Sequence, residues 1–302
     1  IATTFFNLYL RGQLLWNPEA DVDELLRDFY ARFYGPAASA MSQYWGEILG
    51  AWERSIVTEH HHFAIPALYP RPLVARLRRH LEAAEAALRG AEKTGRDAPQ
   101  YAERLRFTRL GFEVLDGYTS MVASVATDAD YVAGVAAGAR GLAARQALAQ
   151  MNPTFVNTKM GESTAAWWTG EVEQYRAVLA RLDGTRGTLV QKLPVEWAFH
   201  RDPHDTGVMR GYAYEPIDLA YWTAHAASQT PETRKDYPTT EWEQLRTDLY
   251  AQAQGVLHPD WQSYTGYLWY RTELTLTAEQ AKGPIRALFP GIFNEGWLYV
   301  NG

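Results

Sequence analysis

The spacing of hydrophobic residues changes once along this chain, near Gly184. Before that point apolar residues recur every three to four positions, and after it they alternate or form short runs bounded by Gly, Pro and Asp. The first spacing predicts amphipathic helices, and alternation predicts half-buried strands. Helices followed by strands favour two domains over interleaved β-α-β units, with a boundary between about Asp183 and Thr188.

The first part of the chain is predicted to form a series of helices. Asn17-Pro18-Glu19 has the residues of a helix start, and apolar residues follow on one face as far as Phe33. Further helices are expected within residues 41–56, 73–88, 101–122, 128–151 and 161–183. Residues 1–16 are β-prone at first and are interpreted as a strand and a helix. Residues 59–66 are predicted to be a loop.

The second part is predicted to form strands. Residues 266–276 alternate between two faces, and residues 188–193, 196–199, 284–289 and 296–302 are further β-like segments. Asn301-Gly302 is a strong hairpin signal, because both residues tolerate positive φ. We therefore expect the chain to stop within a sheet and to be a fragment of a longer protein that also precedes Ile1.

Composition limits the class of protein. The 302 residues are 47% hydrophobic and 21% charged, which is typical of a globular chain, and they include no cysteine. A net charge of −6 without a basic patch argues against nucleic acid as a partner, and no apolar run is long enough to span a bilayer. The 11 Trp and 18 Tyr residues either fill cores or, in part, line a carbohydrate site.

Motifs do not identify a catalytic centre. Adjacent residues such as His60-His61-His62 cannot all face one ion, so no metal site is predicted, although His61 could contact a ligand. The carboxylate pairs Glu171/Glu173 and Glu241/Glu243 have the composition of a glycosidase pair, but their spacing equally suits a charged surface. Phosphate-binding and nucleophile-elbow motifs are absent from the sequence, and we expect no cofactor.

Two groups of residues carry a resemblance to known families. Asn7-Leu8-Tyr9-Leu10, Leu14 to Asp23 and Phe29 to Ala38 resemble bacterial proteins with domain of unknown function 4838, which overlap glycoside hydrolase family 163, endo-acting β-N-acetylglucosaminidases. The second group resembles the galactose-binding-like jelly roll of many glycosidases. It comprises Trp197-Ala198-Phe199-His200-Arg201-Asp202-Pro203, Trp242, Gly266 to Arg271 and Trp297 to Gly302.

The resemblance implies a definite architecture and a function. Residues 1–17 would be the end of an upstream (β/α)8 barrel, 18–184 an α-helical bundle, and 185–302 a β-sandwich jelly roll truncated at its C-terminus. The catalytic carboxylates would lie in the barrel, upstream of Ile1. The parent protein would be a glycoside hydrolase acting on glycans, with an extracellular, periplasmic or cell-surface location.

Several residues are candidates for contact with a carbohydrate substrate. They are Asn7 and Tyr9 at the barrel end, His61, Trp167 and Trp168 in the helical part, and Trp297 at the rim of the predicted sandwich. Each could instead be an ordinary core or surface residue, and Trp297 could pack between two sheets. Two other functions remain open: a non-catalytic carbohydrate-binding module, with Trp269, Trp297 and Asn301 near one rim, or a purely structural accessory domain.

Overall fold

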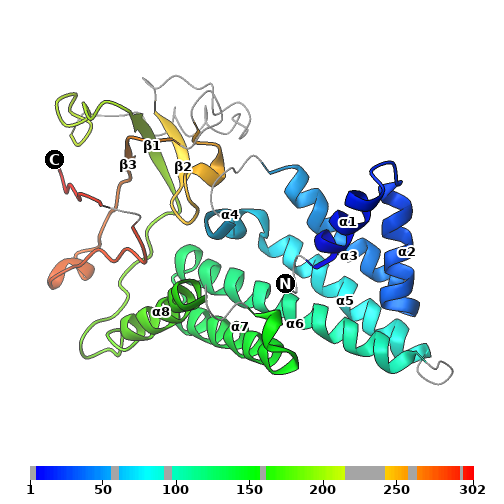
Figure 1. Ribbon diagram of the computed structural model, residues 1–302. Coiled ribbons are helices and arrows are strands. Elements are labelled where there is room, and N and C mark those ends of the chain that lie inside the picture. Colours follow the sequence, from blue (N-terminus) through cyan, green and yellow to red (C-terminus); the bar gives the residue numbers. More distant parts are fainter. Residues whose placement is uncertain are drawn as a thin grey trace. The chain divides into compact units, whose positions relative to one another are not determined.

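The chain divides into two compact units in the computed structural model, which describes residues 5–55, 61–91, 97–156, 161–214, 242–257, 264–292 and 295–302. The first unit comprises Ile1–Ser55, Leu68–Val122 and Tyr131–Ala177. The second comprises Ile56–Ala67, Ala123–Asp130 and Val178–Gly302. The described chain is mainly helical in its N-terminal part and then forms a small open antiparallel sheet (Figure 1).

Helices make up the first unit. They are α1 (Phe5–Trp16), α2 (Val22–Tyr34), α3 (Ala38–Glu53), α5 (Arg71–Ala91), α6 (Ala98–Val122), α7 (Tyr131–Met151) and most of α8 (Gly161–Leu179). Short 3-10 turns occur at Gly35–Ala37 and Pro153–Phe155. The helices predicted from hydrophobic spacing in this part of the chain are confirmed.

Capping decides where α2 begins and ends. The Asp21 side chain accepts a hydrogen bond from the Glu24 backbone N–H (2.9 Å), which satisfies a donor of the first turn. The helix stops before Gly35, whose φ of 54° favours glycine. The helix thus begins at Val22, four residues beyond the Pro18 that the sequence suggested as its first turn.

Aromatic side chains form the core between α1, α2, α3 and α6. Trp45 is buried and donates its indole N–H to the Tyr34 hydroxyl (3.0 Å), which also bonds the Thr108 hydroxyl (2.9 Å). The Phe5 ring contacts the rings of Trp45 and Phe107 at centroid distances of 5.8 and 5.2 Å. Because the buried polar atoms of this cluster are paired with one another, burying the rings carries no cost from unsatisfied groups.

Helices α6 and α7 lie side by side and approach each other closely at two glycines (Figure 1). A Cβ atom added to Gly117 would lie 2.5 Å from the Cα atom of Gly141 and 3.0 Å from the carbonyl oxygen of Ala137. These are backbone atoms, which cannot move aside as a flexible side chain can. The small Ala and Gly side chains of α7 therefore allow the backbones of α6 and α7 to approach closely.

The second unit contains α4 (His61–Leu68) up to Ala67, a π-helical turn at Ala123–Thr127 and a sheet. Strands β1 (Glu196–Asp202), β2 (Glu243–Arg246) and β3 (Tyr267–Arg271) pair antiparallel in the order β2-β1-β3. Phe199 of β1 is opposite Glu243 of β2 and Tyr270 of β3. Short 3-10 turns follow at Gln252–Gln254 and Gln280–Lys282.

Several local expectations are wrong. Residues 5–16 form one helix, so the strand expected there as a barrel remnant is not found among them, and residues 61–66 are helical rather than a loop. Residues 188–193, 284–289 and 296–302 are not strands, and β3 is shorter than the predicted 266–276. Alternation alone did not produce strands where the described chain supplies no pairing partner.

We predict that Gly117→Ala destabilises the helical unit by about 1–3 kcal/mol, because the new methyl group meets backbone of α7. Urea unfolding followed by far-UV circular dichroism measures this. Gly12→Ala in α1 is the matched control: a Cβ there meets nothing within 4 Å, so the change should raise stability by about 0.5–1 kcal/mol. Equal effects of the two substitutions would contradict the close crossing.

Candidate functional site

The sheet of the second unit has two different faces. Phe199, Leu245 and Tyr270 point to one face and pack into a hydrophobic core with Ala251, Val256 and Tyr264. Side chains alternate along a strand, so His200 of β1 and Tyr267 and Trp269 of β3 lie on the other face. That second face is the candidate site.

Aromatic rings cover the second face. The Tyr212 ring lies 5.6 Å from Trp242 and 5.8 Å from Trp269, and His200 lies 4.4 Å from Tyr212. Further along, Trp269 contacts Tyr299 at 5.5 Å and Tyr267 contacts Trp297 at 6.0 Å. We call this set the aromatic face; its members are Tyr212, Trp242, Tyr267, Trp269, Trp297 and Tyr299.

The Asp202 carboxylate fixes the orientation of Trp269. It accepts hydrogen bonds from the backbone N–H groups of Thr206 (2.9 Å) and Gly207 (2.7 Å) and from the Trp269 indole N–H (3.0 Å). Burial alone would raise the pKa of Asp202, but these hydrogen bonds outweigh it and hold the pKa below its ordinary value. A Cβ on Gly207 would lie 2.1 Å from the Trp269 indole nitrogen, so only glycine allows this approach.

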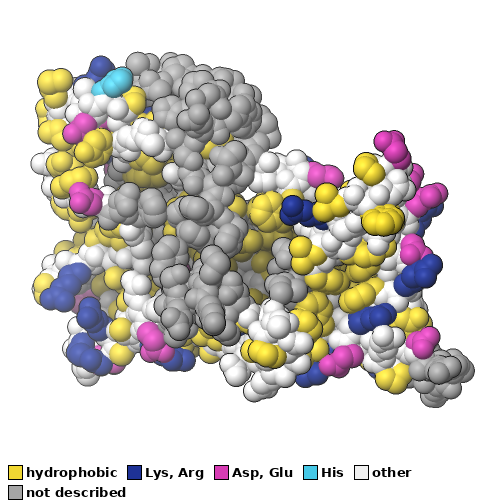
Figure 2. Space-filling model, viewed as in Figure 1, with side chains coloured by type: hydrophobic (Ala, Val, Ile, Leu, Met, Phe, Trp, Pro, Cys, Tyr) yellow, Lys and Arg dark blue, Asp and Glu magenta, His cyan; other side chains and the backbone are white. Residues whose placement is uncertain are grey.

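Part of the aromatic face is open to solvent. Trp297 is 63% exposed, and Tyr267 and Tyr299 are also exposed. Exposed apolar residues flank them: Val208, Met209, Tyr214, Leu298 and Val300. Figure 2 shows hydrophobic side chains gathered over the loop after β1 and over the C-terminal segment. Contiguous exposed apolar surface of this kind marks binding sites more often than it marks neutral surface.

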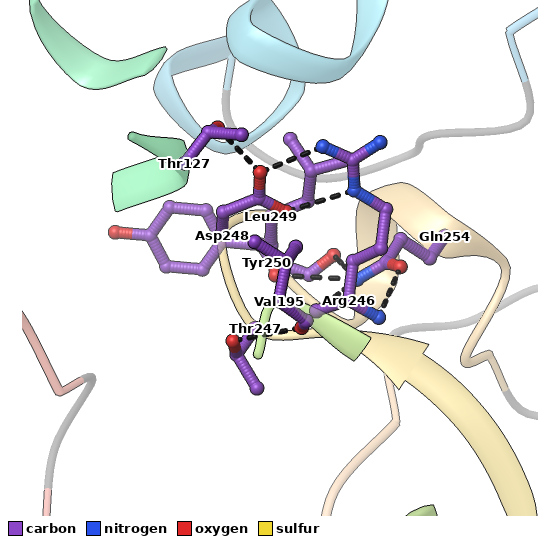
Figure 3. Close-up of polar contacts among 8 residues, drawn as sticks. All are labelled: Thr127, Val195, Arg246, Thr247, Asp248, Leu249, Tyr250 and Gln254. Atoms are coloured by element: carbon purple, nitrogen blue, oxygen red, sulfur yellow. Dashed lines mark hydrogen bonds and ion pairs between the residues drawn. The ribbon is translucent and has the colours of Figure 1, made fainter. Parts of the chain in front are cut away.

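A second polar feature of this unit is the network around Asp248 (Figure 3). The Asp248 carboxylate accepts two hydrogen bonds from Arg246 (2.8 and 2.6 Å) and one from the Thr127 hydroxyl. Gln254 binds the backbone N–H and carbonyl of Arg246 (3.0 and 2.8 Å). Burial would raise the pKa of Asp248, but the bonds from Arg246 and Thr127 lower it overall. Both carboxylate oxygens of Asp248 accept hydrogen bonds within the protein, which indicates a structural role.

The two carboxylate pairs considered in the sequence are described in part. Glu243 is buried and its carboxylate lies 3.1 Å from the Arg201 guanidinium, while Glu241 lies outside the described residues. In α8, desolvation raises the pKa of half-buried Glu171 to about 7, whereas exposed Glu173 pairs with Arg176. Residues two apart on a helix point in different directions, so Glu171 and Glu173 do not face one bond.

The residues predicted to contact substrate occupy different settings. Asn7 is exposed on α1, and Tyr9 is half-buried with its ring 5.0 Å from that of Phe29. His61 begins α4, and Trp167 and Trp168 lie in α8, but the side chains of all three are outside the described residues. Among the three whose side chains the structure describes, Trp297 lies on the aromatic face.

Sequence reasoning missed Tyr267, Tyr299 and Asp202 as members of this site. A signal was present, because Tyr267/Trp269 and Trp297/Tyr299 have the same two-residue spacing and contact each other pairwise. In the sequence Asp202 belongs to the segment that resembles a jelly roll, without a role of its own. Asn301 and Gly302 do have positive φ (58° and 98°), in agreement with the turn signal.

Two negative findings apply to the described residues. In that part of the chain no group of three or more His, Asp or Glu side chains is arranged to hold a metal ion. The helices of the same residues include none with the length and apolar character needed to cross a membrane.

Comparison with known proteins gives one match. The family model of a domain of unknown function (DUF4838) matches residues 2–46, which include α1, α2 and part of α3. No curated protein and no solved structure is significantly similar to the chain. The match agrees with the resemblance carried by residues 7–38, and it covers none of the residues that suggested a jelly roll.

We predict that Asp248→Asn destabilises the second unit by about 1–3 kcal/mol, because it removes the charge that Arg246 and Thr127 surround. Since the folded pKa is lowered, the difference from wild type should be complete above about pH 4 and should shrink as the pH falls below it. Urea unfolding at several pH values measures it. Asp28→Asn, in the exposed Arg32 pair, is the control and should change stability by less than about 0.5 kcal/mol.

A second prediction concerns Glu171. Its folded pKa is raised above the unfolded value of about 4.3, so its contribution to stability is present below that value and is lost as the pH rises through about 7. Wild-type stability should fall by about 1–2 kcal/mol from pH 5 to 8, after allowance for partial solvent exposure, and Glu171→Gln should remove this fall. Glu173→Gln is the control. Parallel pH profiles for wild type and Glu171→Gln would show that Glu171 is not desolvated.

Proposed function

We propose that this chain is an accessory, non-catalytic part of a glycoside hydrolase and that its aromatic face binds glycan. The observation that carries the proposal is the pair of exposed rings, Trp297 and Tyr267, beside the Trp269–Tyr299 pair. A pyranose ring has an apolar C–H face that can lie on an aromatic ring, and hydroxyl groups around its edge. Exposed Trp and Tyr provide both the flat surface and polar tips for those hydroxyls.

Rigidity supports the same proposal. The Trp269 ring is held by Asp202 and enclosed by Gly207 and Tyr212. The Arg271 guanidinium lies 5.6 Å from the centre of the Trp242 ring, which fixes the other end of the face. A preformed aromatic surface binds with little loss of side-chain entropy, because its rings are already ordered before the ligand arrives.

The enzymatic part of the proposal rests on the N-terminal match and on the resemblance of residues 7–38. The parent activity would be that of an endo-acting β-N-acetylglucosaminidase, with its two carboxylates upstream of Ile1. The acidic residues Asp202, Glu243 and Asp248 support this division of labour, since each is buried and bonded within the protein. The sheet would then be one face of a galactose-binding-like jelly roll.

A purely structural role is the second candidate. Burial of Trp242 favours it, because that ring packs against His200 and Tyr212 and offers no surface to a ligand. In this alternative the exposed rings would contact another part of the parent protein.

Calorimetric titration of the chain with N-acetylglucosamine oligomers and with galactosides separates the two candidates. We expect binding of one of these sugars, and we expect Trp297→Ala to weaken it by about 1 kcal/mol, roughly a fivefold rise in Kd. Trp16→Ala is the matched control, because Trp16 is also a solvent-exposed tryptophan, 91% exposed on α1. Absence of binding by the wild-type chain, or equal loss in both variants, would leave only the structural role.

A further inference from the structure

A polar pocket lies in the first unit and shares no residue with the aromatic face. Its cavity volume is about 420 Å³, and its lining residues are Gln43, Gly46, Glu47, Gly50, Arg54 and His80. Five of these follow one another at helical spacing on α3 and its C-terminal cap, and His80 comes from α5. The pocket is open to solvent, because Gln43, Gly46 and Arg54 are exposed, and its volume is in the range of small-molecule sites, so it suits a monosaccharide held at the surface.

Two glycines keep the floor of the pocket open. A Cβ on Gly46 would meet nothing within 4 Å, and the atoms nearest a Cβ on Gly50 are those of the Arg54 guanidinium, the closest at 3.0 Å. Neither glycine has a positive φ. Glycine inside a helix costs about 0.5–1 kcal/mol relative to alanine, and no close packing requires it at Gly46. The two glycines leave space next to the Arg54 guanidinium for a ligand.

The one carboxylate of the pocket lining, that of Glu47, is paired with Arg76, which lies outside the lining. The Arg76 guanidinium holds the Glu47 carboxylate through two hydrogen bonds (2.8 and 3.1 Å). That bond, followed by the charges of Arg76, His80 and Arg54, holds the pKa of Glu47 below its ordinary value despite slight desolvation. One carboxylate is therefore surrounded by two guanidinium groups and an imidazole.

Arg54 is the cation of this group that is available to bind an anionic ligand. Among the residues that the structure describes, Arg76 is occupied by Glu47, whereas Arg54 makes no ion pair and lies over Gly50. A guanidinium presents a planar fork of N–H donors that matches the oxygen atoms of a carboxylate or a sulfate. Gln43 and His80 on the pocket lining supply hydrogen bonds for neutral groups.

We propose that this pocket binds an acidic sugar, with Arg54 pairing with its carboxylate or sulfate group and Gln43 and His80 bonding its hydroxyls. The assignment of the ligand as a sugar rests on the proposed function, whereas the preference for an oxyanion rests on the pocket alone. The pocket adds a second, charge-selective contact to the neutral stacking surface of the aromatic face.

The test is titration of the full chain, followed by NMR or calorimetry, with glucuronate, glucose 6-sulfate and glucose. We expect glucuronate or the sulfate ester to bind at least tenfold more tightly than glucose, and the comparison of these two shows which oxyanion the pocket prefers. Arg54→Gln should weaken that binding at least tenfold. Arg79→Gln is the matched control: it removes the same charge from α5 next to His80, outside the pocket lining, and should change Kd less than twofold.

The Gly46→Gln variant separates loss of binding from loss of folding. Glutamine is a better helix former than glycine and would fill the pocket, so Tm should stay the same or rise while binding of the acidic sugar falls at least tenfold. Equal binding of glucose and the acidic sugars, equal losses in Arg54→Gln and Arg79→Gln, normal binding by Gly46→Gln, or no binding of either acidic sugar would each overturn the proposal.

The Trp297→Ala variant distinguishes failure of the pocket proposal from failure of the proposed glycan binding by the aromatic face. It should leave binding of the acidic sugar within twofold of wild type, because Trp297 does not line the pocket. Failure of the pocket with retained, Trp297-dependent binding of N-acetylglucosamine oligomers would overturn only the acidic-sugar site. The converse result would overturn only glycan binding by the aromatic face.

Discussion

The Asp202 carboxylate is the interaction on which the candidate site depends. It lies at the last residue of β1, and it joins the turn at Thr206 and Gly207 to the Trp269 indole of β3. Three N–H groups converge on one buried carboxylate, which is stable because each lone pair that faces the interior receives a donor. Without it the Trp269 ring would lose its fixed orientation, and the Tyr299 ring that contacts it would lose its support.

Buried charge also explains how so small a sheet can hold its shape. Arg201 and Glu243 pair across β1 and β2 with side chains almost fully buried, and Asp248, two residues after the end of β2, pairs with Arg246. Burying ions is expensive, and such pairs contribute more to a unique arrangement than to net stability. We infer that they fix the β1–β2 register, since a shift by one residue would move Glu243 away from Arg201 to the opposite face.

The sequence predicted those elements that a segment can form by itself. It did not predict those that depend on pairing with a distant segment. Helices α2, α3, α5 and α6 follow from apolar spacing that each segment carries by itself, and α7 follows from its Ala-rich composition. Residues 188–193 and 284–289 have suitable alternation yet form no strand, because a strand also needs a neighbour to bond. Trp297 could be proposed from the polar residues that precede it in the sequence. Tyr267 and Asp202 could not, because their place in the site depends on the pairing of His200 with Trp269 and on the hydrogen bond from Trp269 to Asp202.

The two proposed sugar contacts follow from different physical forces, and this difference decides how they could cooperate. Binding to rings such as Trp297 depends on the shape and apolar faces of the sugar and does not change with salt. Binding to Arg54 depends on charge and weakens as ionic strength rises. The two sites lie in separate compact units. A glycan that carries neutral and acidic sugars therefore offers a ligand to each site, and only its acidic sugars are bound through charge. Salt should therefore reduce binding of such a glycan only to the level set by the aromatic face.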